Sequence, residues 1–426
     1  MKHVSSQKAR DSAVVVDVVR RFGPLSRVDI HHLTNLRPGT ISQLVRELLK
    51  EGRLQEAGPS DNPMGRKQIR LRFNEDCGSI LGIEFDAELV TAAVMDLHPR
   101  IRTLVKEDTR LDGGIDGLVR QLIACTRKVI RQSRVRTDSL QGIVLADPGL
   151  VDSREGISVI SSTIEFWRAV PLKKIFENEF GVPFVLESNT RARTVAERTL
   201  GAGEMADDMI YIDYGTGIGL GVYAEGKLFR GRKECACEFG HTRVVENGPA
   251  CKCGSFGCLE AVAGAPAIGT RVRKAVMEGA HSGVLESVGG DPANITGWSV
   301  FEAAQLGDRM CSATVEDAAN HLGLGLANLV NLFNPSLIVL DQRLQSAGQG
   351  FLDQVMRIVR RQALQRSSED LEFRFSRLGS EAGVLGVAIL LLERFFEIPV
   401  LKPPRFMIEP PAGKYSPASR KAVSAG

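Results

Sequence analysis

The sequence has no long hydrophobic run: no stretch approaches roughly eighteen consecutive apolar residues, the minimum for a membrane-spanning helix. It also has no charged-then-apolar leader, so we expect a cytoplasmic protein without a membrane partner. Only eight cysteines occur in 426 residues, which favours a reducing compartment over a disulfide framework. No repeat of fixed period is present.

The net charge is only +3, but it is unevenly distributed. Residues 1–78 contain fourteen Lys and Arg against nine Asp and Glu, whereas the rest of the chain contains 40 against 42. A basic N-terminal part on a faintly acidic remainder indicates a polyanionic partner for that part alone. The length favours two or three domains, and 43% apolar residues suffice for their cores.

The N-terminal 78 residues predict a winged helix-turn-helix domain. Helices are expected at residues 13–21, 26–34 and 38–52. Ser26 and Asp29 resemble a capping box at the start of the second helix, in which Val28, Ile30 and Leu33 are expected to face inward. Two alternating segments, residues 53–57 and 68–74, then predict a hairpin whose connecting loop forms the wing.

Polar and basic side chains on this domain are typical of DNA recognition. The third helix is expected to present donors outward, of the kind that contact base edges and phosphates in the major groove. These are Arg37, Thr40, Ser42, Gln43 and Arg46. At the wing tip, Arg66 and Lys67 could enter a minor groove. The alternatives are a winged helix that makes only protein contacts and a basic surface that is merely solvated.

Residues 235–260 contain the most specific motif of the chain. His241, Cys251, Cys253 and Cys258 form a three-sulfur, one-nitrogen ligand set, and the glycines within C-x-C-G-x-x-G-C allow the thiolates to face one ion. Such a closed tetrahedral set suits structural zinc rather than a catalytic metal with an open position. The alternative is a group of small buried cysteines beside an unrelated histidine. Because these ligands close the zinc site, the neighbouring carboxylates at 238 and 260 are expected to serve another partner.

E-x-G-H followed by C-x-C-G-x-x-G-C-x-E resembles the signature of the ROK family, which contains bacterial sugar kinases and sugar-responsive repressors. The resemblance runs in order from about residue 12 to 396. It implies a two-lobed α/β body of the actin-like ATPase fold. It also implies that the ring hydroxyls of a sugar are bound by Glu238, His241, Glu260, Ser188 and Asn189. Carboxylates and a metal-oriented imidazole are suitable partners for hydroxyls.

The same resemblance indicates that the kinase elements have degenerated. ROK kinases have D-x-G-G-T at the first phosphate turn, where this chain has Glu84-Phe85-Asp86-Ala87-Glu88. Asp86 and Ala87 stand in place of the two glycines, and the carboxylates of Asp86 and Glu88 would repel a triphosphate.

The catalytic base and the adenine site differ as well. The kinases continue with N-D-A-N, whose Asp is the base, and Asn189 occupies that position here. An amide cannot accept a proton at neutral pH. The G-G of the adenine site is replaced by Asp341-Gln342. Only the second phosphate turn, residues 215–219, keeps its glycines, and such a turn also serves packing.

We therefore expect a transcriptional regulator that is not an enzyme, binds structural zinc and no ATP, and senses a sugar or sugar phosphate. Its partners would be operator DNA and further copies of itself, as a homodimer or dimer of dimers. Two alternatives remain: an active sugar kinase with a DNA-binding domain, and a regulator that answers to a protein instead of sugar. The expected division is a DNA-binding domain at 1–78, a sensor body at 79–400 with lobes 79–188 plus 384–400 and 189–383, and a disordered tail at 401–426.

Overall fold

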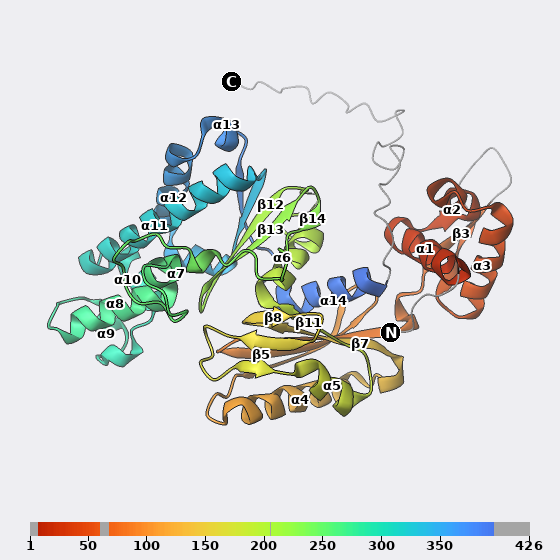
Figure 1. Ribbon diagram of the computed structural model, residues 1–426, viewed down its shortest axis with the longest axis horizontal. Coiled ribbons are helices and arrows are strands. Elements are labelled where there is room, and N and C mark those ends of the chain that lie inside the picture. Colours follow the sequence, from red (N-terminus) through yellow and green to blue (C-terminus); the bar gives the residue numbers. More distant parts are fainter. Residues whose placement is uncertain (1–6, 60–67, 205, 396–426) are drawn as a thin grey trace, which may run out of the picture. The chain divides into compact units, whose positions relative to one another are not determined.

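The computed structural model describes residues 7–59, 68–204 and 206–395. The chain divides into two compact units, with the boundary between Cys77 and Gly78, and each unit is described by itself (Figure 1). The expected tail and the wing tip with Arg66 and Lys67 lie outside the described residues.

The N-terminal unit is a three-helix domain with a small antiparallel sheet (Figure 1). Its sheet has the strand order β1-β3-β2. The elements are α1 (Gln7–Phe22), β1 (Leu25–Ser26), α2 (Arg27–Thr34), α3 (Pro38–Lys50), β2 (Leu54–Pro59), β3 (Ile69–Phe73) and the 3-10 turn η1 (Glu75–Cys77). Ile30, Ile41, Val45 and Leu71 are wholly buried between the helices and the sheet. The winged helix-turn-helix interpretation therefore agrees with the order and packing of the elements.

Local signals placed the start of α2 correctly but not its inward face. Asp29 N–H donates to Ser26 Oγ at 3.2 Å, and Ser26 N–H donates to Asp29 Oδ2 at 2.8 Å, which is the expected capping box. The prediction that Val28 faces inward was wrong, because its side chain is 45% exposed. α2 is only eight residues long, and its strongly buried position is Ile30. A helix of two turns has room for one such contact against α1 and α3.

The body unit begins with a mixed five-stranded sheet of order β11-β7-β4-β5-β6. Strand β4 pairs antiparallel with β5 and parallel with β7, and six of its seven residues are buried. The elements of this part are β4 (Ser79–Phe85), β5 (Leu89–Asp96), β6 (Ile101–Asp108), α4 (Gly114–Ser133), β7 (Leu140–Asp147), α5 (Leu172–Phe180) and β11 (Phe184–Ser188). A small sheet of order β10-β9-β8 adjoins it, made of β8 (Leu150–Asp152), β9 (Ile157–Ile160) and β10 (Arg168–Val170).

A second five-stranded sheet repeats this arrangement, with the order β14-β13-β12-β15-β16. Again the central strand, β12, pairs antiparallel with the strand that follows it and parallel with a later one. Its strands are β12 (Met209–Tyr214), β13 (Ile218–Ala224), β14 (Lys227–Leu228), β15 (Leu337–Leu340) and β16 (Glu372–Phe375). Two sheets with the same order and the same pairing pattern are the arrangement that the actin-like expectation requires.

Helices α6 (Asn189–Leu200) and α14 (Ala382–Phe395) run between the two sheets (Figure 1). Their contact is close, since a Cβ on Gly386 of α14 would collide with the Ala192 carbonyl of α6. The second sheet also carries α7 (Leu259–Ala263), α8 (Ala265–Met277), α9 (Val284–Ser287), α10 (Gly297–Gln305), α11 (Arg309–Phe333), α12 (Gln349–Gln362) and α13 (Gln365–Ser368). The proposed bounds of the two lobes stay a prediction.

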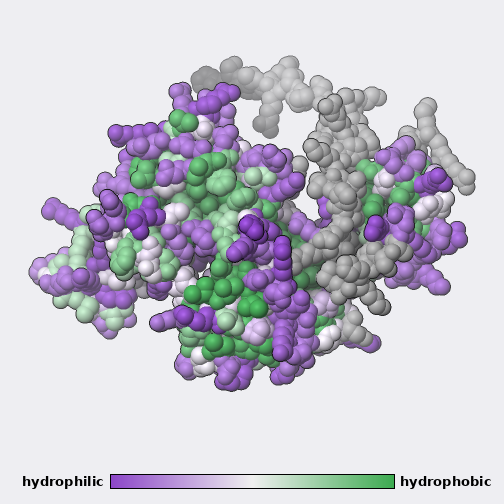
Figure 2. Space-filling model, viewed as in Figure 1, coloured by the Kyte–Doolittle hydropathy of each residue, from purple (hydrophilic) through white to green (hydrophobic). Residues whose placement is uncertain are grey.

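Hydrophobic residues show mainly in the middle of the visible face of the body, and hydrophilic residues along its outer edge (Figure 2). No helix among the described residues is long and apolar enough to cross a membrane.

Candidate functional site

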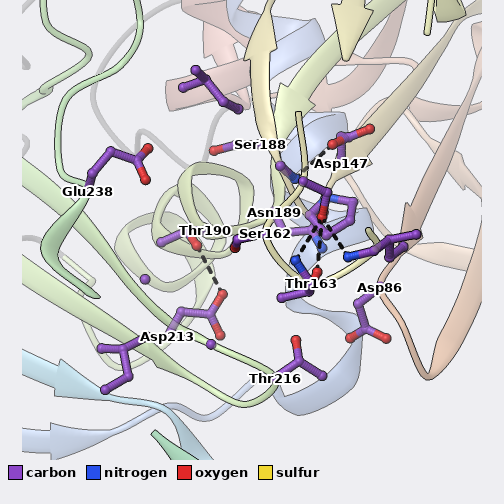
Figure 3. Close-up of a pocket in the computed structure, with 18 of the residues that line it drawn as sticks. Asp86, Asp147, Ser162, Thr163, Ser188, Asn189, Thr190, Asp213, Thr216 and Glu238 are labelled. Carbon is purple, nitrogen blue, oxygen red and sulfur yellow. Dashed lines mark hydrogen bonds between the residues drawn. The ribbon is translucent and has the colours of Figure 1, made fainter. Parts of the chain in front are cut away.

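A cavity of about 890 Å³ opens in the body between the two five-stranded sheets. This volume is typical of small-molecule sites. Its walls come from the turn after β4, the loop after β7, the start of α6, the glycine turn between β12 and β13, and the start of α7. Labelled side chains from several of these elements point toward its centre, among them Glu238, Ser188 and Asp213 (Figure 3).

All five residues expected to bind a sugar line this cavity: Ser188, Asn189, Glu238, His241 and Glu260. Ser188 is also the N-cap of α6, where its Oγ accepts the Arg191 N–H at 3.4 Å. The Asn189 amide donates to the Phe85 carbonyl at 2.8 Å. Its Oδ1 is buried and has no hydrogen-bond partner among the described residues. Asn189 therefore has one free acceptor to offer a hydroxyl group.

The two carboxylates of this set have different surroundings. Glu260 Oε2 accepts the backbone N–H of Ile218 at 3.0 Å, which fixes that carboxylate against the glycine turn. Burial raises the pKa of Glu238, while the nearby charges of His241 and Arg191 lower it. Both can accept hydrogen bonds from the hydroxyl groups of a polyol.

The predicted zinc ligands converge next to the cavity. The side-chain ligand atoms of His241, Cys251, Cys253 and Cys258 all lie within 4.8 Å of one another. Cys253 Sγ is 3.7 Å from Cys258 Sγ, and Cys251 Sγ is 3.6 Å from His241 Nδ1. A tetrahedral ion with Zn–S of about 2.3 Å requires sulfur atoms about 3.8 Å apart. The four residues therefore fit zinc.

Backbone geometry makes this convergence possible. Gly257 has φ of 68°, and a Cβ there would collide with the Val245 carbonyl oxygen, so only glycine fits. Cys258 then begins α7 as its N-cap, which carries Glu260 directly toward the cavity. Because His241 presents Nδ1 to the thiols, its Nε2 is free for a second partner. A bound zinc would thus orient His241, a cavity residue.

An internal cation in the wall of the cavity bridges two carboxylates. Arg193 Nε donates to Glu84 at 2.7 Å and Arg193 Nη1 donates to Asp213 at 2.8 Å. Burial alone would lower the pKa of Arg193, but Asp213 and Glu84 outweigh it and hold the pKa well above its ordinary value. Arg343 extends the network, with Nη2 at 3.0 Å from Asp213 and 2.8 Å from Asp341. These arginines neutralise carboxylates that would otherwise attract a metal ion.

The glycines of the turn at 215–219 are required by close packing. A Cβ at Gly215 would collide with Arg343, one at Gly217 with Glu260, and one at Gly219 with the Thr190 hydroxyl. Side chains of the protein itself therefore fill the space beside this turn. The first turn is closed in a similar way, because Asp86 Oδ1 accepts the N–H groups of Glu88 and Leu89 at 2.8 and 2.9 Å.

Comparison with known proteins identifies the family. The sequence model of the ROK family matches residues 80–394. The chain belongs to the ROK family. It is similar to a xylose repressor of Caldicellulosiruptor bescii, with 28% identity over 375 residues, covering 88% of this chain and 93% of that protein.

Two solved structures of ROK proteins are similar to this chain. A ROK transcriptional regulator, a homologue of the E. coli Mlc protein, has a TM-score of 0.78 at 24% identity and covers 92% of this chain and 98% of its own. A ROK glucokinase from Streptomyces griseus, solved with glucose and AMPPNP, has a TM-score of 0.64 at 30% identity. It covers 74% of this chain and 99% of its own. The actin-like fold inferred from the sequence is thereby confirmed.

Five of the seven residues expected to contact DNA belong to α3 or its N-cap. Arg37, Ser42, Gln43 and Arg46 are exposed and Thr40 is half-buried. Arg37 is the N-cap residue of α3, and the others lie along the helix. The exposure of four of these side chains supports the assignment, which stays a prediction.

Sequence reasoning missed three arginines of the ROK body: Arg191, Arg193 and Arg343, all of which line the cavity. A signal for Arg193 was present. Glu84 and Asp213 each lie within an apolar segment, ILGIEF and MIYIDY, and carboxylates that become buried require a cation. Arg193 and Glu84 are 109 positions apart, so the sequence alone does not indicate which cation neutralises Glu84.

Proposed function

We propose that this ROK protein is a DNA-binding transcriptional repressor whose body senses a sugar and performs no catalysis. The observation that carries this proposal is the contrast between two groups of cavity residues. The residues suited to a sugar all line the cavity, and the zinc set that orients His241 lies next to it. In contrast, Arg193 occupies the gap between Glu84 and Asp213.

The contrast bears directly on catalysis. Phosphoryl transfer needs metal ions on the phosphates and a base for the attacking hydroxyl. Arg193 and Arg343 already neutralise the carboxylates nearby, and Asn189 is an amide at the base position. A kinase activity is therefore disfavoured, although the similar Streptomyces glucokinase shows that such bodies can hold a nucleotide.

Zinc belongs to this proposal as a structural ion held by His241, Cys251, Cys253 and Cys258. When bound, it supplies no catalytic water, because its four positions are taken by protein ligands. Its contribution is to hold His241 and the start of α7, which carries Glu260, at the edge of the cavity.

DNA recognition would use the exposed face of α3. A dimer or a dimer of dimers would present two N-terminal units to a roughly palindromic site. This part of the proposal is supported by the winged helix-turn-helix fold and by similarity to a protein named as a repressor. Light scattering of the zinc-loaded chain gives the oligomeric state.

The decisive experiment selects operator sequences from a random duplex pool with the full-length chain and measures the affinity of the selected duplex. Arg46→Gln should weaken binding and, if Arg46 contacts only phosphate, lower the salt slope by about one unit. Arg366→Gln is the control, because this body arginine is also solvent-exposed, with 93% of its side chain accessible. Selection of no common sequence, or full affinity in an Arg37→Gln/Arg46→Gln double variant, would contradict DNA recognition through α3.

A further inference from the structure

Arg191 is a buried arginine of the cavity whose hydrogen bonds are incomplete. It lies in the first turn of α6 and is 6% exposed. Its Nε donates to Glu187 at 2.6 Å, and its Nη1 donates to the Glu234 carbonyl at 2.9 Å. Its Nη2 is buried and has no hydrogen-bond partner among the described residues. Two nitrogens thus fix the plane of the guanidinium and leave the third available to something in the cavity that Arg191 lines.

Arg191 shares its one hydrogen-bonded carboxylate with a second arginine. Glu187 is wholly buried and faces two cations, Arg191 at 2.6 Å and Arg230 at 2.6 Å. Burial opposes ionisation of Glu187, but both arginines outweigh it and lower its pKa, so the carboxylate is charged. Glu238 is a further carboxylate near Arg191, but Arg191 Nη2 has no hydrogen-bond partner among the described residues. Because a charged donor bonds an anionic oxygen more strongly than a neutral one, this nitrogen favours an anion.

Two other arginines of the cavity each pair with two carboxylates. Arg193 pairs with Glu84 and Asp213, and Arg343 pairs with Asp213 and Asp341. Arg191 pairs with one carboxylate, Glu187, and its Nη2 is a buried nitrogen without a partner among the described residues. Arg191 is therefore distinguished from these two arginines by its surroundings, and not by its residue type.

The free groups next to Arg191 suit a sugar ring. Asn189, two residues earlier in the same helical turn, has the unpaired acceptor Oδ1 and is equally buried, at 6% exposed. One face of the cavity thus offers an acceptor for a hydroxyl group and a cationic donor for an anionic oxygen. A neutral sugar would satisfy the first and leave the second without an anionic partner.

We propose that Arg191 binds a carboxylate of the effector, so that the sugar sensed by this protein is a sugar acid. This inference rests on the proposed sugar-sensing function. A carboxylate is favoured over a phosphate because a single guanidinium nitrogen is unpaired and the carboxylate of Glu238 is nearby, so a monoanion meets less repulsion. A phosphate dianion would bring a further charge, and the remaining cations of the lining, Arg168 and Lys252, are exposed.

Calorimetry with a matched ligand series tests this. Xylose, glucose, glucuronate and glucose 6-phosphate share one ring and differ only in the group on C5. The corresponding series built on galactose (arabinose, galactose, galacturonate and galactose 6-phosphate) covers the other configuration at C4. In the series that fits the cavity, we expect the uronate to bind about 10- to 150-fold more tightly than the neutral sugars, the range of one charge-assisted hydrogen bond.

Variants assign that preference to Arg191. In Arg191→Gln the advantage of the uronate should fall below about threefold, while neutral sugars bind within about threefold of their original affinity. Arg191→Lys keeps the cation and should restore part of the preference, which a merely structural role would not do. Arg230→Gln is the matched control, since it removes the other partner of Glu187 but does not line the cavity, and it should retain the preference.

The outcomes separate the two proposals. Equal or tighter binding of the neutral sugars overturns the sugar-acid inference and leaves sugar sensing intact. Tightest binding of a sugar phosphate also overturns it. An unchanged uronate preference in Arg191→Gln removes Arg191 from the site. If no sugar of either series binds to zinc-loaded protein, both this inference and the proposed sensing function fail.

Discussion

Arg193 Nε lies 2.7 Å from Glu84 Oε1, although the two residues are 109 positions apart and belong to different structural layers. Glu84 ends the central strand of the first sheet, and Arg193 lies on α6 between the sheets. The same guanidinium reaches Asp213 of the second sheet at 2.8 Å. The guanidinium of Arg193 therefore links the two sheets of the body. It does so where a kinase of this fold would bind a nucleotide together with its metal ion.

Removing this cation should destabilise the body strongly. Arg193→Met leaves Glu84 and Asp213 buried without their shared partner, at a cost of about 3–5 kcal/mol. Arg366→Met is the control, since Arg366 pairs with Glu369 at the surface and its loss should cost less than about 0.5 kcal/mol. Urea denaturation of the full, zinc-loaded chain measures both. Equal stabilities of the two variants would show that the network does not hold the halves together.

ATP should be neither bound tightly nor hydrolysed by the unmodified protein. Asn189→Asp restores a carboxylate at the base position, yet we expect it to form no sugar phosphate, because Arg193 and Arg343 still occupy the neighbouring carboxylates. A coupled assay for ADP with both sugar series and Mg²⁺ measures this, with a ROK glucokinase as positive control. Sugar-phosphate formation by the wild-type chain would refute the non-enzymatic interpretation outright.

We predict both the zinc content of the protein and the effect of losing zinc on sugar binding. Protein purified without added metal should contain about one zinc per chain, measured by mass spectrometry. Cys258→Ser should reduce this to near zero and abolish sugar binding, because His241 and the loop before Glu260 lose their anchor. Cys77→Ser, a free cysteine outside the ligand set, should keep the metal. Folded wild-type protein without zinc that still binds sugar would contradict the prediction.

The success of the sequence reasoning depended on how local each signal was. The zinc set lies within eighteen residues and the capping box of Ser26 and Asp29 within four, so spacing alone determined their geometry. The Arg193 network combines residues from β4, α6 and β12, and only the folded chain brings them together. Inward and outward faces of the short helix α2 were equally hard to predict, because its two turns hardly establish a periodicity. Val28 was misplaced for that reason.

Asp147 should make stability depend on pH. It is wholly buried at the end of β7, where its Oδ2 accepts the Trp167 indole N–H at 2.8 Å and its Oδ1 accepts the Gly149 N–H at 2.8 Å. Burial raises its pKa from 3.8 to about 6, despite these hydrogen bonds. The folded state therefore holds the proton more tightly than the unfolded state, and its contribution to stability is lost as the pH rises through about 6.

The matching measurement compares wild type with Asp147→Asn by urea denaturation between pH 4.5 and pH 7. We expect the wild type to lose about 2 kcal/mol more than the variant across this interval, since other titrating groups cancel in the difference. Trp167 fluorescence should report the same transition. If both proteins show the same pH profile, Asp147 is ionised throughout, and its hydrogen bonds outweigh the cost of burial.

Communication between the sugar cavity and the DNA-binding unit is the remaining consequence. Strand β3 of the first unit ends at Phe73 and β4 of the body begins at Ser79, so only residues 74–78 connect them, with the 3-10 turn Glu75–Cys77 in between. Such a short connection cannot isolate the first unit as a long flexible linker would. We therefore expect sugar and operator DNA to influence each other's binding.

The coupling between sugar and operator must be reciprocal. If sugar changes the operator's dissociation constant by some factor, operator must change the sugar's by the same factor, typically about 5- to 150-fold. The sugar should release DNA, because ligand closure of the cavity in a dimer would alter the spacing of two DNA-binding units, and operator half-sites tolerate little change in spacing. Titrating the ligand that binds most tightly into protein with and without saturating operator measures the factor directly. Matching factors from the two titrations support one coupled equilibrium, whereas identical sugar affinities in both would show that the body does not control DNA binding through this ligand.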